Sequence, residues 1–480
     1  MTRSLRATLR ALSLALVLAT LGVLAAPPHG PRGVVAASPP YALTVPLVVA
    51  NRDNVVPHPF GVQIYGTISD AALSIAQLRT ARVHWMRWEV NWGAVVGSVP
   101  TDTPAYNWYF DASARQARDS GLNVILTILG NPAWAALQSP DGIPYKNGPI
   151  LPEYLDEFAA FVSATADRYP WITYYEFYNE PDNAGILQAE LGGPYWGPYG
   201  AEYAAMLKAV YPALKAANPE AQVVLGGIAY DLFEEQVGDG QGFRRSFLDD
   251  VLAAGGGEWF DVFNFHYYPA FAYGWEQQAE GRELVAKANY LRALLADAGY
   301  GDKPFFCTEV GAPSGASPDH TPQPTPESQA RYVTQTAARA VASDLEALIW
   351  FAWKDFAGDS VYEHYGLVTQ ALALKPSALA FRAATQKLGS ATYVRNLPLD
   401  EMGIEGYEFR AANGAPLYLL WSVDGASPTV TFPVTRARLC DMYGTPVREV
   451  ADATDGTEDG QIVVAVGGNP IYVEVLDAAS

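Results

Sequence analysis

The 480-residue sequence contains only two cysteines, Cys307 and Cys440. This scarcity excludes a disulfide-stapled scaffold and any zinc or iron–sulfur site built from cysteine. Cys307 lies inside an apolar run, so we expect two isolated buried thiols and no disulfide between them. The sequence also lacks a His-x-His pair or a clustered Asp/His set, and we therefore expect no bound metal and no cofactor.

Positively charged residues are also few. The chain has 31 Lys and Arg against 51 Asp and Glu, a formal net charge of −20. Nucleic acids and anionic membranes are bound by basic faces, so we exclude both as partners. Only 17% of the residues are charged and 50% are hydrophobic, which excludes a disordered chain and supplies a large core.

The N-terminal segment has the pattern of an export signal. Three arginines precede an apolar run from Ala11 to Ala26. This run is interrupted by polar residues and is short for a membrane span of about 20 residues. We expect residues 1–37 to be a signal peptide, residues 38–59 to form an N-terminal extension, and the protein to be secreted. The alternative is an uncleaved anchor, which also places the remaining chain outside the cytoplasm.

Residues 60–388 alternate between short apolar runs and longer amphipathic ones. The eight strand candidates are Phe60–Tyr65, Val83–Val90, Leu122–Leu129, Ile172–Tyr178, Gln222–Gly227, Asp261–His266, Pro304–Thr308 and Ala347–Phe351. Helical patterns lie between them, the first capped by Ser69. Eight strand–helix units predict a (β/α)₈ TIM barrel, an α/β fold. The alternative is an open doubly wound sheet, which usually has a Gly-rich phosphate turn after its first strand. Tyr65-Gly-Thr-Ile-Ser is not such a turn.

Residues 389–480 show a different pattern of short strands separated by turn signals. The sequences Ala412-Asn-Gly-Ala and Val466-Gly-Gly-Asn-Pro are predicted as hairpin turns. This region is therefore predicted to be a small antiparallel β-sandwich, an accessory domain following the barrel.

Two glutamates stand where predicted barrel strands end. Glu180 follows Asn179 at the end of the fourth strand, and Glu309 ends the seventh. Strands four and seven lie across the barrel axis, so the two carboxylates should face each other over the opening. Such a pair, in an aromatic cleft with no metal set nearby, is what glycoside hydrolysis requires. One carboxyl group protonates the leaving oxygen and the other meets the anomeric carbon.

The chain resembles the clan A glycoside hydrolases, retaining enzymes built on (β/α)₈ barrels. The shared order is an Arg on strand two, Asn-Glu-Pro ending strand four, His-x-Tyr ending strand six, Thr-Glu ending strand seven and a Trp on strand eight. In this chain these are Arg87, Asn179 to Pro181, His266 to Tyr268, Thr308 with Glu309, and Trp353. The resemblance covers about residues 60–388 and is greatest to family 39 and its endo-acting relatives. Families 5 and 30 are the alternatives.

The resemblance implies a role for each of these residues. Glu180 is implied as general acid/base and Glu309 as nucleophile, with carboxyl groups about 5–5.5 Å apart. The implied substrate-binding residues are Asn179 at the sugar 2-hydroxyl, Arg87 and Tyr268 holding Glu309 ionised, His266 lining the sugar subsite, and Trp353 and Trp134 as stacking surfaces. Arg87 is alternatively a structural ion pair with Glu176 or Glu89.

The resulting hypothesis is a monomeric enzyme that hydrolyses β-glycosidic bonds of a poly- or oligosaccharide with retention of configuration. The alternative is a secreted, non-catalytic carbohydrate-binding protein on a hydrolase scaffold. Strand alternation further predicts that Cys307 points the same way as Glu309, into the barrel.

Overall fold

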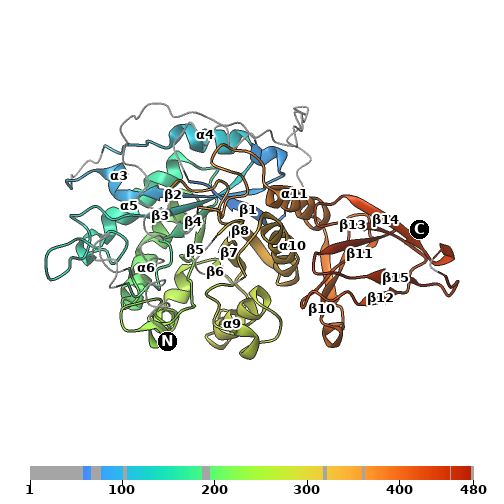
Figure 1. Ribbon diagram of the computed structural model, residues 1–480. Coiled ribbons are helices and arrows are strands. Elements are labelled where there is room, and N and C mark those ends of the chain that lie inside the picture. The colour runs from blue at the N-terminus through green and yellow to red at the C-terminus, as the bar shows by residue number, and fades with distance from the viewer. Residues whose placement is uncertain are drawn as a thin grey trace.

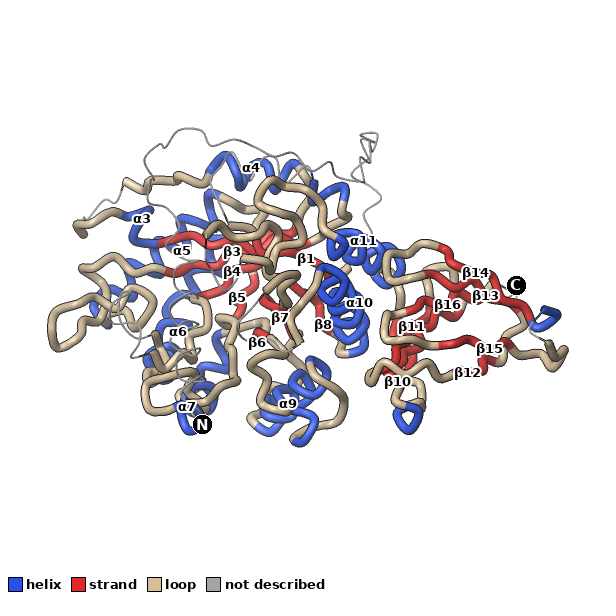
Figure 2. The backbone as a smooth tube through the Cα atoms, in the orientation of Figure 1, coloured by secondary structure: helices blue, strands red, loops and turns tan. Residues whose placement is uncertain are grey.

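The computed structural model describes residues 58–65, 77–100, 105–185, 195–316, 322–358, 363–454 and 456–476. The predicted signal peptide, almost all of the predicted extension and the first part of the helix predicted at Ser69 lie outside these ranges, and residues 77–80 at the end of that helix are helical. No helix in the described ranges is long and apolar enough to cross a membrane. Figures 1 and 2 show a barrel of strands surrounded by helices, with a separate β domain beside α10 and α11.

The larger part of the chain is the predicted (β/α)₈ barrel. Its strands are β1 (Phe60–Gln63), β2 (Trp85–Asn91), β3 (Asn123–Leu129), β4 (Tyr174–Phe177), β5 (Gln222–Val224), β6 (Phe263–Tyr267), β7 (Phe305–Val310) and β8 (Leu345–Trp350). They form one parallel sheet in the order β5-β4-β3-β2-β1-β8-β7-β6. Single parallel bridges, Val224 to Val262 and Ile228 to Phe265, join β5 to β6 and close the barrel.

Helices follow the strands at the predicted places. They are α3 (Trp92–Val96), α4 (Asp111–Asp119), α5 (Leu155–Arg168), α6 (Gly200–Ala217), α7 (Glu234–Val237), α8 (Phe247–Ala253), α9 (Leu284–Asp297), α10 (Pro326–Ala342) and α11 (Pro376–Leu388). The sequence determines where α10 begins: Thr325 accepts a hydrogen bond from the Ser328 amide, and Pro326 occupies the first turn. The short helices α3 and α7 were not predicted, because one turn gives no helical periodicity.

The barrel interior changes character along its axis. Its lower part is filled by an apolar cluster of Trp85, Ile125, Val224, Val262, Phe306, Ala347 and Ile349. Above this plug, the inward-pointing positions of β2 and β4 carry Arg87 and Glu176, which are both fully buried. Polar groups therefore collect at the carboxyl ends of the strands, where active sites of such barrels lie.

An irregularity in β7 sets the direction of Glu309. Phe265 pairs with Cys307 in the β6–β7 ladder. The next residue of β6, His266, pairs with Glu309, which leaves Thr308 as an extra residue in β7. A bulge of this kind re-aims the side chain that follows it. Cys307 points outward into the core shared with the helices, because it follows the interior Phe306, whereas the bulge turns Glu309 inward. The prediction that Cys307 points the same way as Glu309 is therefore wrong.

The C-terminal part is antiparallel, as predicted. Its strands are β9 (Thr392–Asn396), β10 (Ile404–Arg410), β11 (Pro416–Ser422), β12 (Thr429–Phe432), β13 (Arg436–Cys440), β14 (Pro446–Ala451), β15 (Ile462–Ala465) and β16 (Ile471–Val475). Six of them form a sheet in the order β14-β13-β16-β11-β10-β9, and β12 pairs with β15. The turn at Ala412 joins the paired strands β10 and β11, as expected. The turn after Val466 instead crosses from one sheet to the other, because β16 pairs with β11 and β13, so that hairpin prediction is wrong. Both cysteines are free and buried, as predicted.

A buried ion network fastens the β domain to the barrel. Arg339 of α10 donates to both carboxylate oxygens of Glu405 in β10, at 2.9 and 2.8 Å, and also to Glu283. The guanidinium lies 5.5 Å from the Trp421 ring centroid, and the Tyr407 hydroxyl donates to Glu405 at 2.6 Å. The Arg339–Glu405 ion pair therefore joins α10 of the barrel to β10 of the β domain.

We expect Arg339→Met to lower the free energy of unfolding by about 3–5 kcal/mol, because it leaves the Glu405 carboxylate buried without its cation. Denaturant titration followed by fluorescence measures this change. The matched control is Arg331→Met on the same helix, whose guanidinium donates to Asn469 at 2.8 Å in exposed surroundings. Equal effects of the two substitutions would contradict the structural role of Arg339.

Candidate active site

The chain bends sharply where β4 ends, and this bend presents two polar side chains to the barrel mouth. Tyr178 and Glu180 both have positive φ angles, 64° and 44°. Non-glycine residues in this region are strained, and such strain concentrates at functional sites. The Tyr178 hydroxyl is anchored on Asn131 at 2.5 Å, and the Glu180 amide donates to the carbonyl of Gly227 at 3.0 Å. Asn179 and Glu180 thereby both face the opening.

Arg87 is the centre of the buried polar network. Its Nε and Nη2 donate to the two carboxylate oxygens of Glu176 at 2.6 and 3.0 Å. Its Nη1 donates to Glu309 at 2.7 Å and to Gln63 at 3.1 Å, and Nη2 also reaches Asn179 at 2.7 Å. Arg87 therefore forms the ion pair with Glu176 that the structural alternative expects, and it also contacts Glu309; its role in catalysis stays a prediction.

Both carboxylate oxygens of Glu309 accept a hydrogen bond. Oε1 accepts from Arg87, and Oε2 accepts from the Tyr268 hydroxyl at 2.8 Å. Burial raises the pKa of Glu309, while Arg87 and the Tyr268 hydroxyl oppose that rise. The sequence predicted the lowering influence of these two partners correctly, but the net direction is upward because Glu309 is only 3% exposed.

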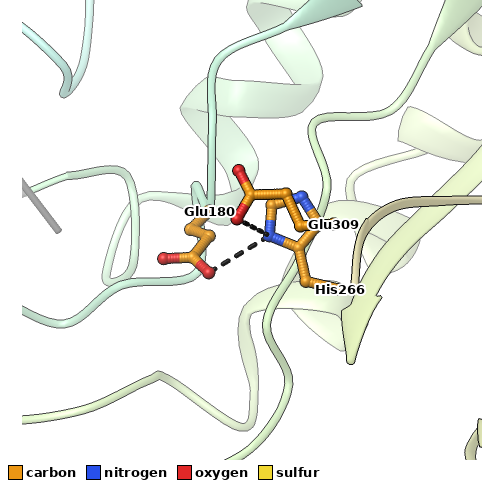
Figure 3. A group of neighbouring side chains, drawn as sticks. All are labelled: Glu180, His266 and Glu309. Atoms are coloured by element: carbon orange, nitrogen blue, oxygen red, sulfur yellow. Dashed lines mark hydrogen bonds and ion pairs between the residues drawn. The ribbon is translucent and has the colours of Figure 1, made fainter. Parts of the chain in front are cut away.

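Glu180 lies in a different environment. Its Oε1 lies 3.1 Å from Nδ1 of His266, and Oε2 has no hydrogen-bond partner among the described residues. Burial raises the pKa of Glu180 well above its usual range, and the negative charges of Glu309 and Asp182 raise it further. Figure 3 shows the imidazole of His266 between the two carboxylates. Of the two carboxyl groups, Glu180 therefore holds a proton more readily than Glu309, because no cation or phenol bonded to it opposes the rise of its pKa.

His266 is a neutral bridge between the two acids. Burial and the positive charges of Arg87 and Lys287 lower its pKa well below the usual value. Its Nε2 lies 3.2 Å from the Thr308 hydroxyl. A Cβ at Gly227 would lie 2.1 Å from this nitrogen, so the ring occupies space that only glycine leaves open. The position of His266 thus depends on the segment after β5.

The two carboxylates lie close together. One ligand atom each from Glu180, His266 and Glu309 can be chosen so that all three lie within 4.8 Å of one another. This is the one group of acidic, His or Cys side chains in the described ranges with a spacing that suits a metal ion. The guanidinium of Arg87 already pairs with Glu309 at 2.7 Å, and a fixed positive charge at that distance disfavours a second cation.

The two predicted tryptophans are placed differently. Trp353 is 1% exposed and packs in the main core cluster, so it does not present a stacking face and this prediction is wrong in the structure. Phe351, two residues earlier, lies beside Tyr268 with ring centroids 6.1 Å apart. The sequence alone could not show which of the two aromatic residues after β8, Phe351 or Trp353, lies beside Tyr268. Trp134 is partly exposed and packs against Trp92 and Tyr154; its role in sugar binding stays a prediction.

Several residues of the network were not predicted as part of the site. Asn264 donates to Glu176 and to Thr308, both at 2.8 Å, and Gln63 accepts from Arg87. The signal that could have found Asn264 is its spacing, two residues before His266 in the same strand. Glu89, two residues after Arg87, was considered only as a structural partner of that arginine.

Comparison with known proteins finds similarity in structure only. No family model matches the sequence, and no curated protein matches it. A family 39 glycoside hydrolase from the gut symbiont Bacteroides cellulosilyticus WH2 superimposes with a TM-score of 0.67 and 18% identity, covering 88% of this chain and 82% of the other. The catalytic domain of the GH30 xylanase C from Talaromyces cellulolyticus gives 0.60 and 14%, covering 88% and 97%. A GH30 endoxylanase from Clostridium papyrosolvens C71 gives 0.57 and 13%, covering 88% and 96%. At such identities a match shows the fold alone: the chain shares the fold of these glycoside hydrolases.

Proposed function

We propose that this protein is a retaining glycoside hydrolase that cleaves β-linked poly- or oligosaccharides. The observation that carries the proposal is the unequal treatment of two adjacent buried carboxyl groups. Glu309 is bonded to a cation and a phenol, whereas Glu180 faces a neutral imidazole and has one oxygen without a described partner. The fold shared with a family 39 glycoside hydrolase and with GH30 xylanases supports the same conclusion.

The proposed mechanism assigns one step to each carboxyl group. Ionised Glu309 attacks the anomeric carbon while protonated Glu180 gives its proton to the leaving oxygen. Glu180 then removes a proton from water, which attacks the same carbon and releases Glu309. The close approach of the carboxylate oxygens supports this double displacement, because inverting enzymes hold the carboxyl groups about 6.5–9.5 Å apart to fit a water molecule.

Trapping of the covalent intermediate tests the proposal. Incubation with 2-deoxy-2-fluoro-β-glycosyl fluorides of xylose, glucose and mannose should add one glycosyl mass to the protein, on the peptide that contains Glu309. The control is Glu309→Gln, which should stay unlabelled. A protein that binds oligosaccharides in calorimetry but shows neither turnover nor an adduct would be the non-catalytic carbohydrate-binding protein instead.

We also propose that residues 1–37 direct export of the protein, on the basis of the sequence pattern alone.

The pH dependence follows from the two carboxyl groups. Turnover needs Glu309 ionised and Glu180 protonated, so kcat/KM should rise through the pKa of Glu309 and fall through that of Glu180. Because burial raises both pKa values, we expect the acid limb to lie above the ordinary carboxyl value of about 4.3. Glycosylation by a dinitrophenyl glycoside needs no acid, so kcat/KM for that substrate should lose its basic limb. A basic limb that persists with this substrate would contradict the assignment of Glu180.

Removal of metal ions should leave the activity unchanged. The proposed chemistry uses only protons and carboxylates, and Arg87 already neutralises Glu309. We expect kcat/KM after dialysis against EDTA to stay within about twofold of the untreated value. A loss that a single divalent metal restores would show that the Glu180–His266–Glu309 group holds a functional ion.

A further inference from the structure

A third carboxyl group reaches the barrel mouth from β2. Glu89 lies two residues after Arg87, so both side chains leave the strand on the inner side. Arg87 is fully buried, whereas Glu89 stays partly exposed. Glu89 therefore stands closer to the opening than the network that holds the catalytic pair.

Glu89 differs from Glu176, the structural carboxylate of the network. Glu176 accepts hydrogen bonds from Arg87, Thr127, Asn264, Thr308 and the Gly227 amide. In the described part of the chain Glu89 receives one bond, from the Tyr65 hydroxyl at 3.4 Å. A partly exposed carboxylate with so little hydrogen bonding to the protein has acceptor capacity left for a ligand hydroxyl group.

Glu89 lies among other charged groups of the barrel mouth. Burial raises the pKa of Glu89 to about 7, and the neighbours that modify it are Arg87, which lowers it, and Glu309 and Glu176, which raise it. Arg87, one inward position earlier in β2, donates to Glu309 at 2.7 Å, so Glu89 lies at the barrel mouth next to the residues that hold Glu309.

We propose that Glu89 binds a ring hydroxyl group of the sugar attacked by Glu309 and selects sugars that carry this hydroxyl unsubstituted. The inference rests on the proposed function and names the chemistry that its substrate must offer. The Tyr65 hydroxyl orients the carboxylate, and the sugar hydroxyl supplies the donor that the protein does not.

The test compares substrates that keep or lack single hydroxyl groups. The probes are 2,4-dinitrophenyl β-glycosides of xylose, glucose and mannose, and the 3-deoxy and 4-deoxy forms of the one hydrolysed fastest. At about pH 8, where Glu89 with its pKa of about 7 is mostly ionised, Glu89→Gln should lower kcat/KM for the parent substrate by roughly 10- to 100-fold, because it removes a hydrogen bond to a charged group. For the deoxy form that lacks the bound hydroxyl, wild type and variant should differ by less than about threefold.

Two further variants complete the test. Glu346→Gln removes an exposed carboxyl near the start of β8 and should change neither substrate's kcat/KM. Tyr65→Phe loosens Glu89 and should give a smaller loss with the same dependence on the hydroxyl, even if Glu89→Gln folds poorly. Equal losses on parent and deoxy substrates, or no loss at all, would overturn the role of Glu89 while leaving the hydrolase proposal intact. Absence of turnover by wild type on every glycoside, together with no fluorosugar adduct, would overturn both.

Discussion

Glu309→Ala is expected to lower kcat by at least about 10⁴-fold on every substrate, because no covalent glycosyl intermediate can form without the nucleophile. Glu180→Ala should behave differently. A dinitrophenyl leaving group needs no proton, so the first step with such a substrate should survive while hydrolysis of polysaccharide is lost. Initial rates on both substrate types measure the contrast.

Azide separates the two roles further. Azide needs no general base, so it should attack the glycosyl-enzyme of Glu180→Ala, raise its turnover and give the β-glycosyl azide. Rescue of Glu309→Ala to the β-glycosyl azide instead, with Glu180→Ala inactive in azide, would exchange the two roles. Full activity of both variants would rule out catalysis by this pair. The matched control is Glu346→Gln, a barrel-strand glutamate outside the site.

Arg87→Met is expected to have the second largest effect, since it removes both structural and catalytic support. Glu176 would remain fully buried without its cation, and breaking a buried pair in this way costs about 3–5 kcal/mol of unfolding free energy. Loss of the guanidinium also raises the pKa of Glu309, because its ionised form is no longer stabilised. The acid limb of the pH profile should therefore move to higher pH. Denaturant titration and kcat/KM against pH measure the two consequences.

The double variant Arg87→Met/Glu176→Gln distinguishes these consequences. It removes the unpaired charge, so most of the lost unfolding free energy should return. Activity should not return, because Glu309 still lacks its partner at 2.7 Å. Recovery of both quantities would mean that Arg87 contributes only to folding, and an unchanged pH profile in the single variant would contradict its action on Glu309.

The sequence by itself determined the barrel, because periodicity and strand spacing report burial directly. It also placed Glu180 and Glu309 at strand ends on opposite sides of the axis, and the structure brings both to His266. The antiparallel β domain followed from the same alternation of short strands and turn signals. These features depend on hydrophobic periodicity, strand spacing and turn signals, which can be read from a single sequence.

The tertiary structure decided what depends on local departures from that pattern. The extra residue Thr308 turns Glu309 inward, although plain alternation from the interior Phe306 would point it outward. Trp353 is buried in the core while Phe351 lies beside Tyr268, a difference of two residues that no periodicity encodes. The unequal pKa shifts of Glu180 and Glu309 arise from burial and from charged or polar neighbours that are far apart in sequence, among them Arg87 on β2, Glu176 on β4 and Tyr268 after β6. Only the closed barrel brings these neighbours together.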